Sequence, residues 1–296
     1  MLPPPLPSLD TLIQQAAARL RAAGDDSPHI CARALAQAVT GLERTGLILA
    51  GPRPLAPELA ARLDDAVARR CAGEPLAHIL GQREFFGRDF AVTPDTLIPR
   101  PETELLVELA LQHMRETETR HPASAPLRLA DLGAGSGCIG ITLLAERPRW
   151  LGLLLDISPA ALAVARRNGG THGVARRLRC LVADMAHAPL APRSLHLLVS
   201  NPPYIAHAER PEVMEDVLRH EPHAALFSPD DGLAHLRAAC RAAAEALVPG
   251  GHLLLEHGWR QGPAVRDILT SSGFDDVTTH TDLAGHERCT QGRLLR

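Results

Sequence analysis

The stretch LRLADLGAGSG, residues 127–137, decides the fold of this chain. A short apolar run passes through an aspartate into three closely spaced glycines, and a helical pattern follows from Ile139 to Ala145. Glycine lets the backbone turn tightly and approach a ligand, while the helix N-terminus offers free N–H donors. The stretch therefore predicts an α/β protein with a nucleotide or adenosyl site. Its spacing departs from GxGxxG, so the loop alone does not separate a dinucleotide from other adenosyl ligands.

Strands and helices alternate along the chain around this loop. Apart from the strand at 127–132, strands are expected at 151–156, 179–183, 195–200 and 251–256, and helices at 102–115, 159–168, 232–247 and 263–271, followed by two short extended segments. This alternation predicts a parallel sheet that helices cover on both faces.

The first part of the chain has a different pattern. Apolar residues recur at helical spacing over 9–20, 28–39 and 57–71, which predicts a small bundle whose role is structural or partner-binding. Residues 73–99 hold short alternating runs between glycines and prolines, which favours a β-hairpin connector. We accordingly divide the chain into an N-terminal helical partner-binding domain at 1–75, a hairpin linker at 76–99 and a catalytic domain at 100–296.

Composition limits the class of protein. The chain has 296 residues, enough for two domains, and 45% of them are hydrophobic, which is too many for a disordered chain. A net charge of -3 argues against a nonspecific nucleic-acid coat. No apolar run approaches the roughly 20 residues that span a bilayer, and the N-terminus lacks the regions of a signal peptide. The six cysteines are far apart, which predicts free thiols, a cytoplasmic location and no zinc site.

Two aspartates follow strands of the predicted sheet. Asp156 comes about 20 residues after the glycine loop, where a carboxylate accepts hydrogen bonds from both ribose hydroxyls of an adenosine. Asp184 follows the next strand, within reach of an adenine amino group. The alternatives are a helix cap or a solvated acid for Asp156, and a turn residue for Asp184.

The sequence Ser200-Asn-Pro-Pro-Tyr204 follows the strand at 195–200 and contains one of only two asparagines in the chain. Open α/β sheets bind ligands at the carboxyl ends of their strands, so this segment is expected beside the glycine loop. Two prolines remove two N–H donors, which leaves the Asn201 side-chain oxygen and the Pro202 carbonyl as acceptors for a planar NH2 group. The ring of Tyr204 is suited to packing on that group. The alternative is a rigid proline turn without chemistry.

These residues resemble the class I S-adenosylmethionine-dependent methyltransferases that methylate planar NH2 groups, and more narrowly the bacterial peptide chain release factor N5-glutamine methyltransferases. The resemblance runs nearly from end to end. It includes GEPLAH at 73–78, QREFF at 82–86, LIPRPETE at 97–104, the loop at 131–137, DISP at 156–159, NPPY at 201–204, EP at 221–222, AL at 225–226 and LEHG at 255–258. NPPY is shared with adenine methyltransferases, whereas LIPRPETE joined to the helical head and hairpin is more specific.

The resemblance implies a Rossmann-like fold with a mainly parallel seven-stranded sheet, an N-terminal helical bundle and a hairpin connector. It implies S-adenosylmethionine as the cofactor, no metal, and class I release factors as the protein substrate, with no nucleic-acid substrate and no membrane. The catalytic residues would be Asn201, Pro202, Pro203 and Tyr204, and the cofactor-binding residues Gly133, Ala134, Gly135, Ser136, Gly137, Asp156, Asp184, Met185 and Asn201.

The family also implies a mechanism. The substrate is the side-chain amide of the glutamine in a Gly-Gly-Gln loop, whose nitrogen is a poor nucleophile because its lone pair is delocalised. Acceptors at Asn201 and the Pro202 carbonyl would orient this nitrogen toward the methyl group, and Tyr204 would pack on the amide plane. No general base stands out in the sequence.

Some positions leave alternatives open. Met185 stands where the family often has an aromatic residue, so its contact with the adenine is not implied. Arg100 lies between two prolines and either lines the crevice or pairs with Glu102 or Glu104. The pair at 256–257, Glu-His, either packs at a strand end or takes part in acid–base chemistry.

Two other function classes stay open at this point. A nucleic-acid adenine methyltransferase predicts a target-reading insertion and a basic surface, and neither is evident in the sequence. A non-catalytic binding module predicts a damaged glycine loop or NPPY segment, and both are intact.

Overall fold

The computed structural model describes residues 6–295. The chain divides into two compact units, with the boundary between Gly81 and Gln82. The first unit has one apolar core and the second unit has separate cores on the two faces of its sheet, so the units are described separately. None of the described helices is long and apolar enough to cross a membrane.

The first unit is helical. It contains α1 (Leu9–Ala22), α2 (Pro28–Thr40), α3 (Arg44–Ala50), α4 (Pro57–Cys71) and α5 (Leu76–Leu80). The helix ends follow the sequence signals: the Ser8 hydroxyl accepts a hydrogen bond from the Thr11 N–H, and Pro28 and Pro57 occupy first helical positions. The apolar faces of α1, α2 and α4 meet in a core that includes Leu20, Leu35 and Val67, among others. The three predicted helices are therefore confirmed, and α3 and α5 are additional.

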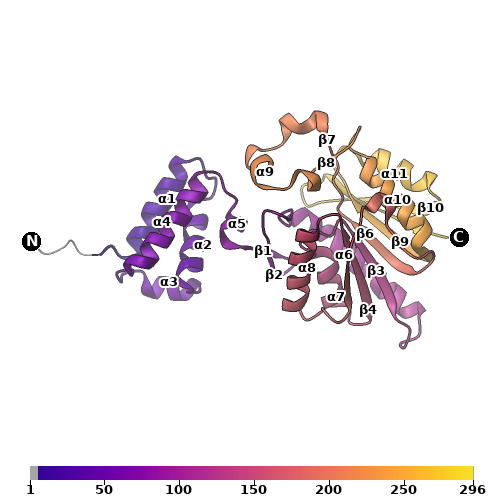
Figure 1. Ribbon diagram of the computed structural model, residues 1–296, viewed down its shortest axis with the longest axis horizontal. Coiled ribbons are helices and arrows are strands. Elements are labelled where there is room, and N and C mark those ends of the chain that lie inside the picture. The colour runs from indigo at the N-terminus through magenta and orange to yellow at the C-terminus, as the bar shows by residue number, and fades with distance from the viewer. Residues whose placement is uncertain (1–5, 296) are drawn as a thin grey trace, which may run out of the picture. The chain divides into compact units, whose positions relative to one another are not determined.

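The second unit contains a seven-stranded sheet (Figure 1). Its strands are β3 (Leu127–Leu132), β4 (Trp150–Asp156), β5 (Leu178–Val182), β6 (Leu195–Ser200), β9 (Leu247–Glu256), β10 (Phe274–Thr281) and β11 (Glu287–Leu294). The order across the sheet is β10-β11-β9-β6-β3-β4-β5. The strands from β9 to β5 are parallel, and β11 runs antiparallel to both of its neighbours. The predicted mainly parallel sheet is confirmed.

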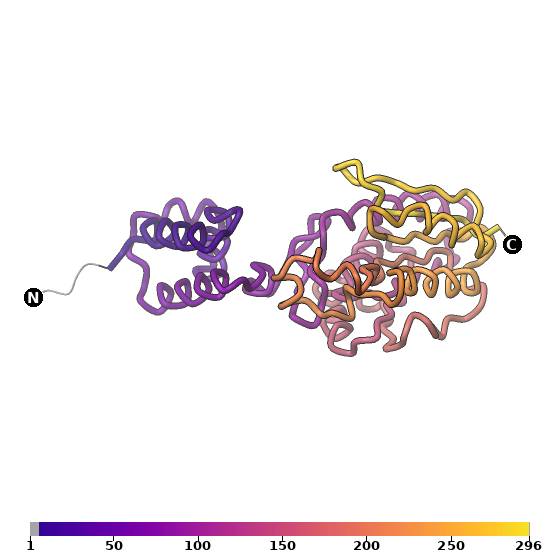
Figure 2. Tube along the Cα trace, turned by 90° about the horizontal axis from the view of Figure 1, so that it is seen from above, coloured from indigo at the N-terminus to yellow at the C-terminus, as the bar shows by residue number. Residues whose placement is uncertain are grey.

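Helices cover both faces of this sheet. One apolar core joins it to α6 (Glu104–Arg120), α7 (Cys138–Glu146) and α8 (Pro159–Thr171). A second core joins the other face to α10 (Ala234–Ala246) and α11 (Gly262–Ser271). The strands supply both cores because successive side chains point to opposite faces: Leu129 of β3 faces the first core, and Ala130 the second. Figure 2 shows the two C-terminal strands side by side, with their connecting turn projecting from the unit.

The hairpin of β1 (Gln82–Phe85) and β2 (Arg88–Ala91) packs as part of the second unit. Phe85 and Phe90 meet edge to face, with 6.1 Å between ring centroids, and are buried in the core that α6, α7 and α8 share with the sheet. Asn168 of α8 fixes the hairpin further. Its side chain exchanges hydrogen bonds with the Ala91 backbone at 2.9 and 3.0 Å and donates another to the Ser136 carbonyl at 2.8 Å. The hairpin expected over 73–99 is present, and these contacts tie it to the glycine loop.

The segment between β6 and α10 forms structure that the sequence pattern did not predict. It contains the short parallel pair β7 (Ile205–Ala206) and β8 (Phe227–Ser228), the short 3-10 helices η3 (His207–Glu212) and η4 (His223–Ala225), and α9 (Glu215–His220). Val217, Leu226 and Phe227 form a small core here, against which Leu97 and Ile205 pack. These contacts bring the segment against the LIPRPETE stretch.

Candidate active site

The glycine loop after β3 has the tight conformation that its sequence predicts. Gly133, Gly135 and Gly137 all have positive φ values, of 70°, 55° and 80°, which residues with a side chain rarely adopt. The Gly133 N–H donates to the Leu155 carbonyl at 2.8 Å, which ties the loop to β4. At Gly137 a Cβ would lie 2.6 Å from Cδ1 of Ile141, so this glycine is also required by packing.

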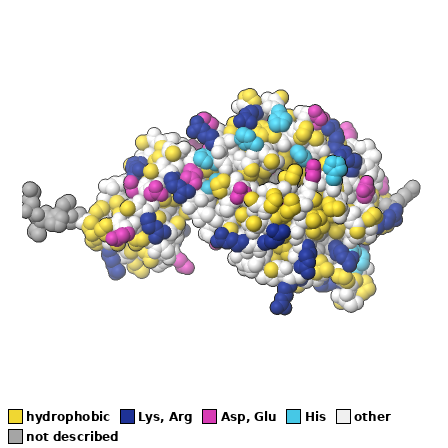
Figure 3. Space-filling model, in the orientation of Figure 1, with side chains coloured by type: hydrophobic (Ala, Val, Ile, Leu, Met, Phe, Trp, Pro, Cys, Tyr) yellow, Lys and Arg dark blue, Asp and Glu magenta, His cyan; other side chains and the backbone are white. Residues whose placement is uncertain are grey.

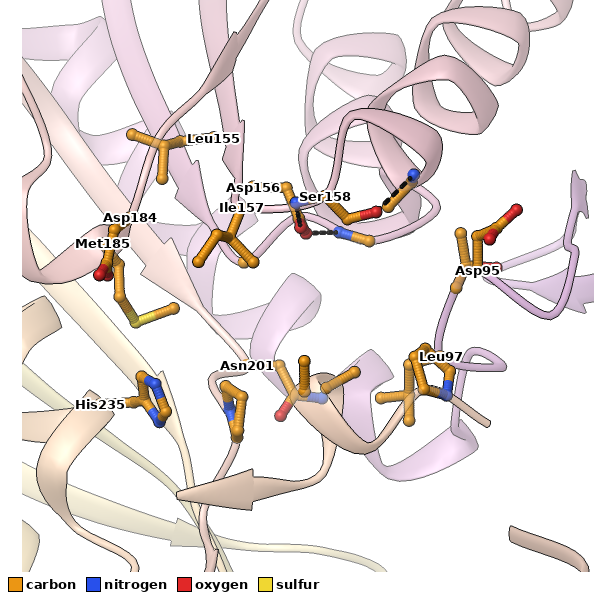
Figure 4. A pocket seen from close by; sticks show the side chains of 18 of the residues that line it. Asp95, Leu97, Leu155, Asp156, Ile157, Ser158, Asp184, Met185, Asn201 and His235 are labelled. Carbon is orange, nitrogen blue, oxygen red and sulfur yellow. Dashed lines mark hydrogen bonds between the residues drawn. The ribbon is translucent and has the colours of Figure 1, made fainter. Parts of the chain in front are cut away.

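Asp156, the last residue of β4, is oriented by two backbone donors. Its Oδ2 accepts from the Gly135 N–H and its Oδ1 from the Ser158 N–H, both at 2.8 Å (Figure 4). The cap of α8 is Ser158, whose hydroxyl accepts from the Ala161 N–H at 3.1 Å. Asp156 is therefore not the helix cap. Both of its oxygens retain lone pairs for further donors.

A cavity of about 260 Å³ lies at the carboxyl ends of β3 to β6. Its lining includes six of the predicted cofactor residues: Gly133, Gly135, Asp156, Asp184, Met185 and Asn201. Figure 4 shows Asp156, Met185 and Asn201 on different sides of this hollow, each near the end of a different strand. Ala134, Ser136 and Gly137 do not line it. Ala134 and Ser136 are buried, and Gly137 packs against the core, so these three shape the loop from behind.

Asp184 and Met185 form one side of the cavity. The Asp184 carboxylate accepts a hydrogen bond from the Ala186 N–H at 2.8 Å and so caps the turn η2 (Met185–His187), while it also lines the cavity. Met185 is buried, and its terminal methyl lies 3.2 Å from where a Cβ on Gly133 would stand. The thioether therefore packs directly against the glycine loop, which places it where it can contact a purine.

His235 also lines this cavity, although no sequence pattern pointed to it. It belongs to α10, and its Nδ1 is hydrogen-bonded to the Ser228 hydroxyl at 2.9 Å. Burial lowers the pKa of His235, so the ring is neutral near pH 7. A lone histidine in an alanine-rich helix carries no spacing signal, and only the fold brings it to the site.

A second cavity, of about 300 Å³, adjoins the first. Pro202 and Tyr204 line it, Pro203 lines the first cavity, and Asn201 lines both. The side chains of the NPPY segment therefore line two cavities, and Asn201 lies on the wall that the two cavities share. Burial of its hydroxyl raises the pKa of Tyr204, which keeps the phenol neutral.

The Asn201 side chain has a defined orientation. Its Nδ2 donates to the Thr103 hydroxyl at 3.2 Å, which directs Oδ1 the opposite way. Thr103 belongs to the turn η1 (Pro101–Thr103) at the start of α6 and is buried. The LIPRPETE stretch therefore contributes directly to the positioning of the NPPY asparagine.

Glu221 anchors the same stretch. Its buried carboxylate accepts from the Ile98 N–H at 3.0 Å and pairs with Arg100. Arg100 lines the second cavity, which agrees with the expectation that it lines the crevice. Its ion-pair partner is Glu221, and not Glu102 or Glu104 as the other expectation had it. Two segments about 120 residues apart are thereby joined through one carboxylate.

Glu256 and His257, at the end of β9, have different surroundings. His257 is buried and hydrogen-bonded to the Thr290 hydroxyl at 2.8 Å, which is a packing role within the sheet. Glu256 is also buried but lines the second cavity. Burial raises the pKa of the Glu256 carboxyl to about 7, against the opposing effect of a hydrogen bond from Thr103.

The donors and acceptors of the first cavity fit S-adenosylmethionine. Asp156 offers an oriented pair of acceptors for ribose hydroxyls. Asp184 lines the same cavity beside the apolar side chain of Met185. The glycine backbone permits close approach of the ligand. The second cavity offers acceptors and an aromatic ring suited to a planar amide.

Comparisons with known proteins agree with this geometry. Residues 11–81 match the family model of the PrmC N-terminal domain, and residues 107–227 that of the methyltransferase small domain. In sequence, the chain is 43% identical to a release factor glutamine methyltransferase of Nitratidesulfovibrio vulgaris, over 95% of this chain and 93% of the relative. It is 40% identical to that of Escherichia coli K12, over 96% and 98%.

Among solved structures, the hMettl16 catalytic domain in complex with the MAT2A 3'UTR hairpin 6 has a TM-score of 0.54 at 15% identity, covering 78% of this chain and 83% of that chain. At this identity the likeness shows the methyltransferase fold alone. The sequence relatives go further, because identity of 40% or more extends over nearly the whole length of both chains. The chain belongs to the family of release factor glutamine methyltransferases.

Proposed function

We propose that this chain transfers a methyl group from S-adenosylmethionine to the side-chain amide nitrogen (N5) of the glutamine in the Gly-Gly-Gln motif of class I peptide chain release factors. The observation that carries the proposal is the position of Asn201. It lies on the common wall of the two cavities, and its Nδ2 is held by Thr103 so that Oδ1 is free for a donor. Family membership supports the release factor as the substrate.

The proposed mechanism is mainly positioning. S-adenosylmethionine, when bound, supplies an electrophilic methyl group on a positively charged sulfur. Asn201 Oδ1 and the Pro202 carbonyl accept the two N–H groups of the glutamine amide, which turns its nitrogen toward the first cavity. Tyr204 packs on the amide plane and excludes water from it. Acceptors fixed in advance in this way lower the barrier because no reorganisation is needed at the moment of transfer.

The cofactor roles are proposed from the first cavity. Asp156 accepts from the ribose hydroxyls, Asp184 from the adenine amino group, and Met185 packs on the purine. The glycine loop at 133–137 provides close backbone approach. The proposal includes no metal, because the leaving sulfur is already cationic.

The helical unit is proposed to bind the release factor. A protein substrate needs a larger contact than a single glutamine provides, and the first unit carries exposed apolar side chains at Ile30, Ile48 and Leu49. Charges of both signs lie on the visible face of the second unit in Figure 3, with apolar side chains gathered in its middle. We expect a protein rather than a nucleic acid as substrate, and action in the cytoplasm, where release factors work.

Mass spectrometry of a purified class I release factor, incubated with the enzyme and S-adenosylmethionine, tests the proposal. We expect a gain of one CH2 unit on the glutamine of the Gly-Gly-Gln motif, and none on adenine-containing DNA. The variant Asn201→Ala should reduce the rate by about 100-fold or more, the loss typical when one oriented polar contact to the reacting group is removed. Methylation of DNA, or unchanged turnover by Asn201→Ala, would contradict the proposal.

A further inference from the structure

Glu256 is a buried carboxylate at the active site that takes no part in the proposed mechanism. It is the last residue of β9, only 3% of its surface is exposed, and it lines the second cavity together with Asn201 and Tyr204. Its Oε2 has no hydrogen-bond partner within residues 6–295. Burying a carboxylate is unfavourable, so a carboxylate at this position calls for an explanation.

The surroundings of Glu256 connect it to Asn201. Asn201 and Glu256 line the same cavity, and the side chains of Thr103 and Asn201 lie close enough to the Glu256 carboxylate to lower its pKa. Nδ2 of Asn201 donates a hydrogen bond to the Thr103 hydroxyl at 3.2 Å. The three side chains therefore form one small network behind the wall of the cavity. We propose that Glu256 is a positioning residue that fixes which way the Asn201 amide faces. This inference rests on the proposed function, because it concerns the oxygen that would accept from the substrate amide.

The symmetry of an amide explains why such a residue is needed. The two ends of the Asn201 side chain, Oδ1 and Nδ2, are nearly equal in size, so packing alone does not choose between them. The Thr103 hydroxyl both donates and accepts, so it holds the NH2 end of Asn201 only while its own proton is directed to another acceptor. The neighbouring Glu256 carboxylate is suited to be that acceptor. An ionised carboxylate only accepts, and it therefore selects the NH2 end of Asn201. With its NH2 end selected in this way, Asn201 presents Oδ1 to the substrate. A reversed Asn201 amide would instead place its own NH2 group against the NH2 group of the substrate glutamine.

The protonation state of Glu256 matters for this selection. A protonated carboxyl donates a hydrogen bond and so accommodates the reversed amide as well. Its pKa is raised by burial to about 7, lowered by the Thr103 hydrogen bond and by Arg288, and raised by Glu102. The other titratable or charged groups that face it are Tyr204, Cys138, Cys289 and Arg100. Activity is therefore expected to rise with pH through about 7 as Glu256 ionises.

The first test is the variant Glu256→Gln. Its amide no longer selects the NH2 end of Asn201, so we expect kcat to fall by about tenfold to 100-fold, as small misplacements of a positioning group do. The Kd for S-adenosylmethionine should stay unchanged, and the rise of kcat through pH 7 should disappear.

Stability separates this role from a structural one. The folded-state pKa of Glu256 lies above its unfolded value, so its contribution to folding is lost as pH rises through the folded pKa. At pH 8 the neutral glutamine relieves a buried charge. Glu256→Gln should then melt no lower than the unaltered protein while turning over more slowly, which a merely structural residue would not do.

The second test reverses the sign of the effect. In the variant Asn201→Asp both side-chain ends are oxygens, so orientation no longer matters, and Glu256 only repels the new carboxylate. Adding Glu256→Gln to Asn201→Asp should raise kcat, because the glutamine NH2 donates to the carboxylate introduced at position 201. The matched control is Glu118→Gln, which replaces a part-buried carboxylate that accepts from Trp150 Nε1 at 2.9 Å, away from both cavities.

All variants are full-length chains assayed with an intact release factor over a range of pH. Unchanged kcat and an unchanged pH profile in Glu256→Gln would overturn the inference. The inference would also be overturned if Glu256→Gln lowered kcat by the same factor in the otherwise unaltered chain and in the Asn201→Asp variant. Failure of the unaltered enzyme to methylate the factor would instead overturn the proposed function. The two failures are thus distinguishable.

Discussion

Asp156 and Asn201 depend on partners that fix their orientation before any ligand arrives. Backbone N–H groups of Gly135 and Ser158 hold the carboxylate of Asp156, and the Thr103 hydroxyl holds the amide of Asn201. An acceptor that is already oriented loses little conformational entropy on binding, which is the source of much affinity and rate. Both residues lie at strand ends, so the rigid sheet sets the distance between them.

A prediction at this scale concerns Asp156→Ala. The variant removes the acceptors proposed for the ribose, and hydrogen bonds to a charged group contribute about 1.5–3 kcal/mol. We expect the Kd for S-adenosylmethionine to rise by about 10- to 100-fold, measured by isothermal titration calorimetry. Asp267→Asn, an exposed acid on α11, is the control and should leave the Kd unchanged. Equal affinity in both variants would remove Asp156 from the cofactor site.

Single site residues could be predicted from the sequence when they lie within a motif, and could not when only the fold brings them to the site. Asp156 and Asn201 were identified because each comes after an apolar run at the end of a strand. His235 was not, since its place in the cavity depends on how α10 packs on the sheet. The partner of Arg100 was also missed, because Glu221 is distant in sequence and only tertiary structure brings the two together.

At the scale of elements, the glycine loop combines two different requirements. Gly135 has φ +55° and no atom within 4 Å of the position that a Cβ would take, whereas Gly137 has φ +80° and would place that carbon against Ile141 and Leu154. The first glycine therefore serves the ligand, and the second serves the packing of β4 and α7.

This difference gives a matched pair of variants. Both Gly135→Ala and Gly137→Ala strain the backbone by about 1–2 kcal/mol. Gly137→Ala adds overpacking, which typically costs about 1–3 kcal/mol. We expect urea unfolding to show the larger loss of stability for Gly137→Ala. Gly135→Ala should instead weaken cofactor binding, because its methyl group enters the cavity. Equal stabilities would contradict the packing role of Gly137.

Glu221 offers a further prediction between elements. It joins the stretch at 98–100 to the segment after α9 through the Ile98 N–H and Arg100. Glu221→Ala leaves a buried donor unsatisfied, and we expect a loss of about 1–3 kcal/mol in the free energy of unfolding. Glu221→Gln keeps an acceptor for Ile98 and should lose less. Chemical denaturation measures both, and an alanine variant as stable as the parent would refute the anchoring role.

Helices and strands could be predicted where they are long enough for their pattern of apolar residues to be recognised. The strands at 127–132 and 195–200 were predicted at their observed bounds, since each is an apolar run with clear ends. Helices α3 and α5, with seven and five residues, are too short for a helical period to show. The segment 205–228 depends on contacts of Val217 and Phe227 with Leu97 and Ile205, which no local pattern reports.

At the scale of the whole molecule, the two cavities belong to the second unit alone. Every residue that lines them lies between Pro94 and Glu256, and the hairpin that precedes them packs in the same core. The first unit has its own core, and its described residues, 6–81, supply none of these lining residues. Cofactor binding and partner binding are therefore expected to be separable.

A truncated chain of residues 82–296 tests this separation. We expect its Kd for S-adenosylmethionine to match that of the full chain, while its KM for the release factor rises. Calorimetry and steady-state methyl transfer measure the two quantities. Full efficiency of the truncated chain on an intact release factor would contradict the partner role of the helical unit.

The shared wall at Asn201 has a consequence for the order of events in turnover. Because the two cavities are distinct spaces that meet at this residue, neither occupant blocks the other. Methyl transfer across such a wall requires both substrates to be present at once and passes through no methylated enzyme. Initial rates measured at several concentrations of each substrate should therefore give intersecting rather than parallel double-reciprocal lines, the signature of a sequential mechanism.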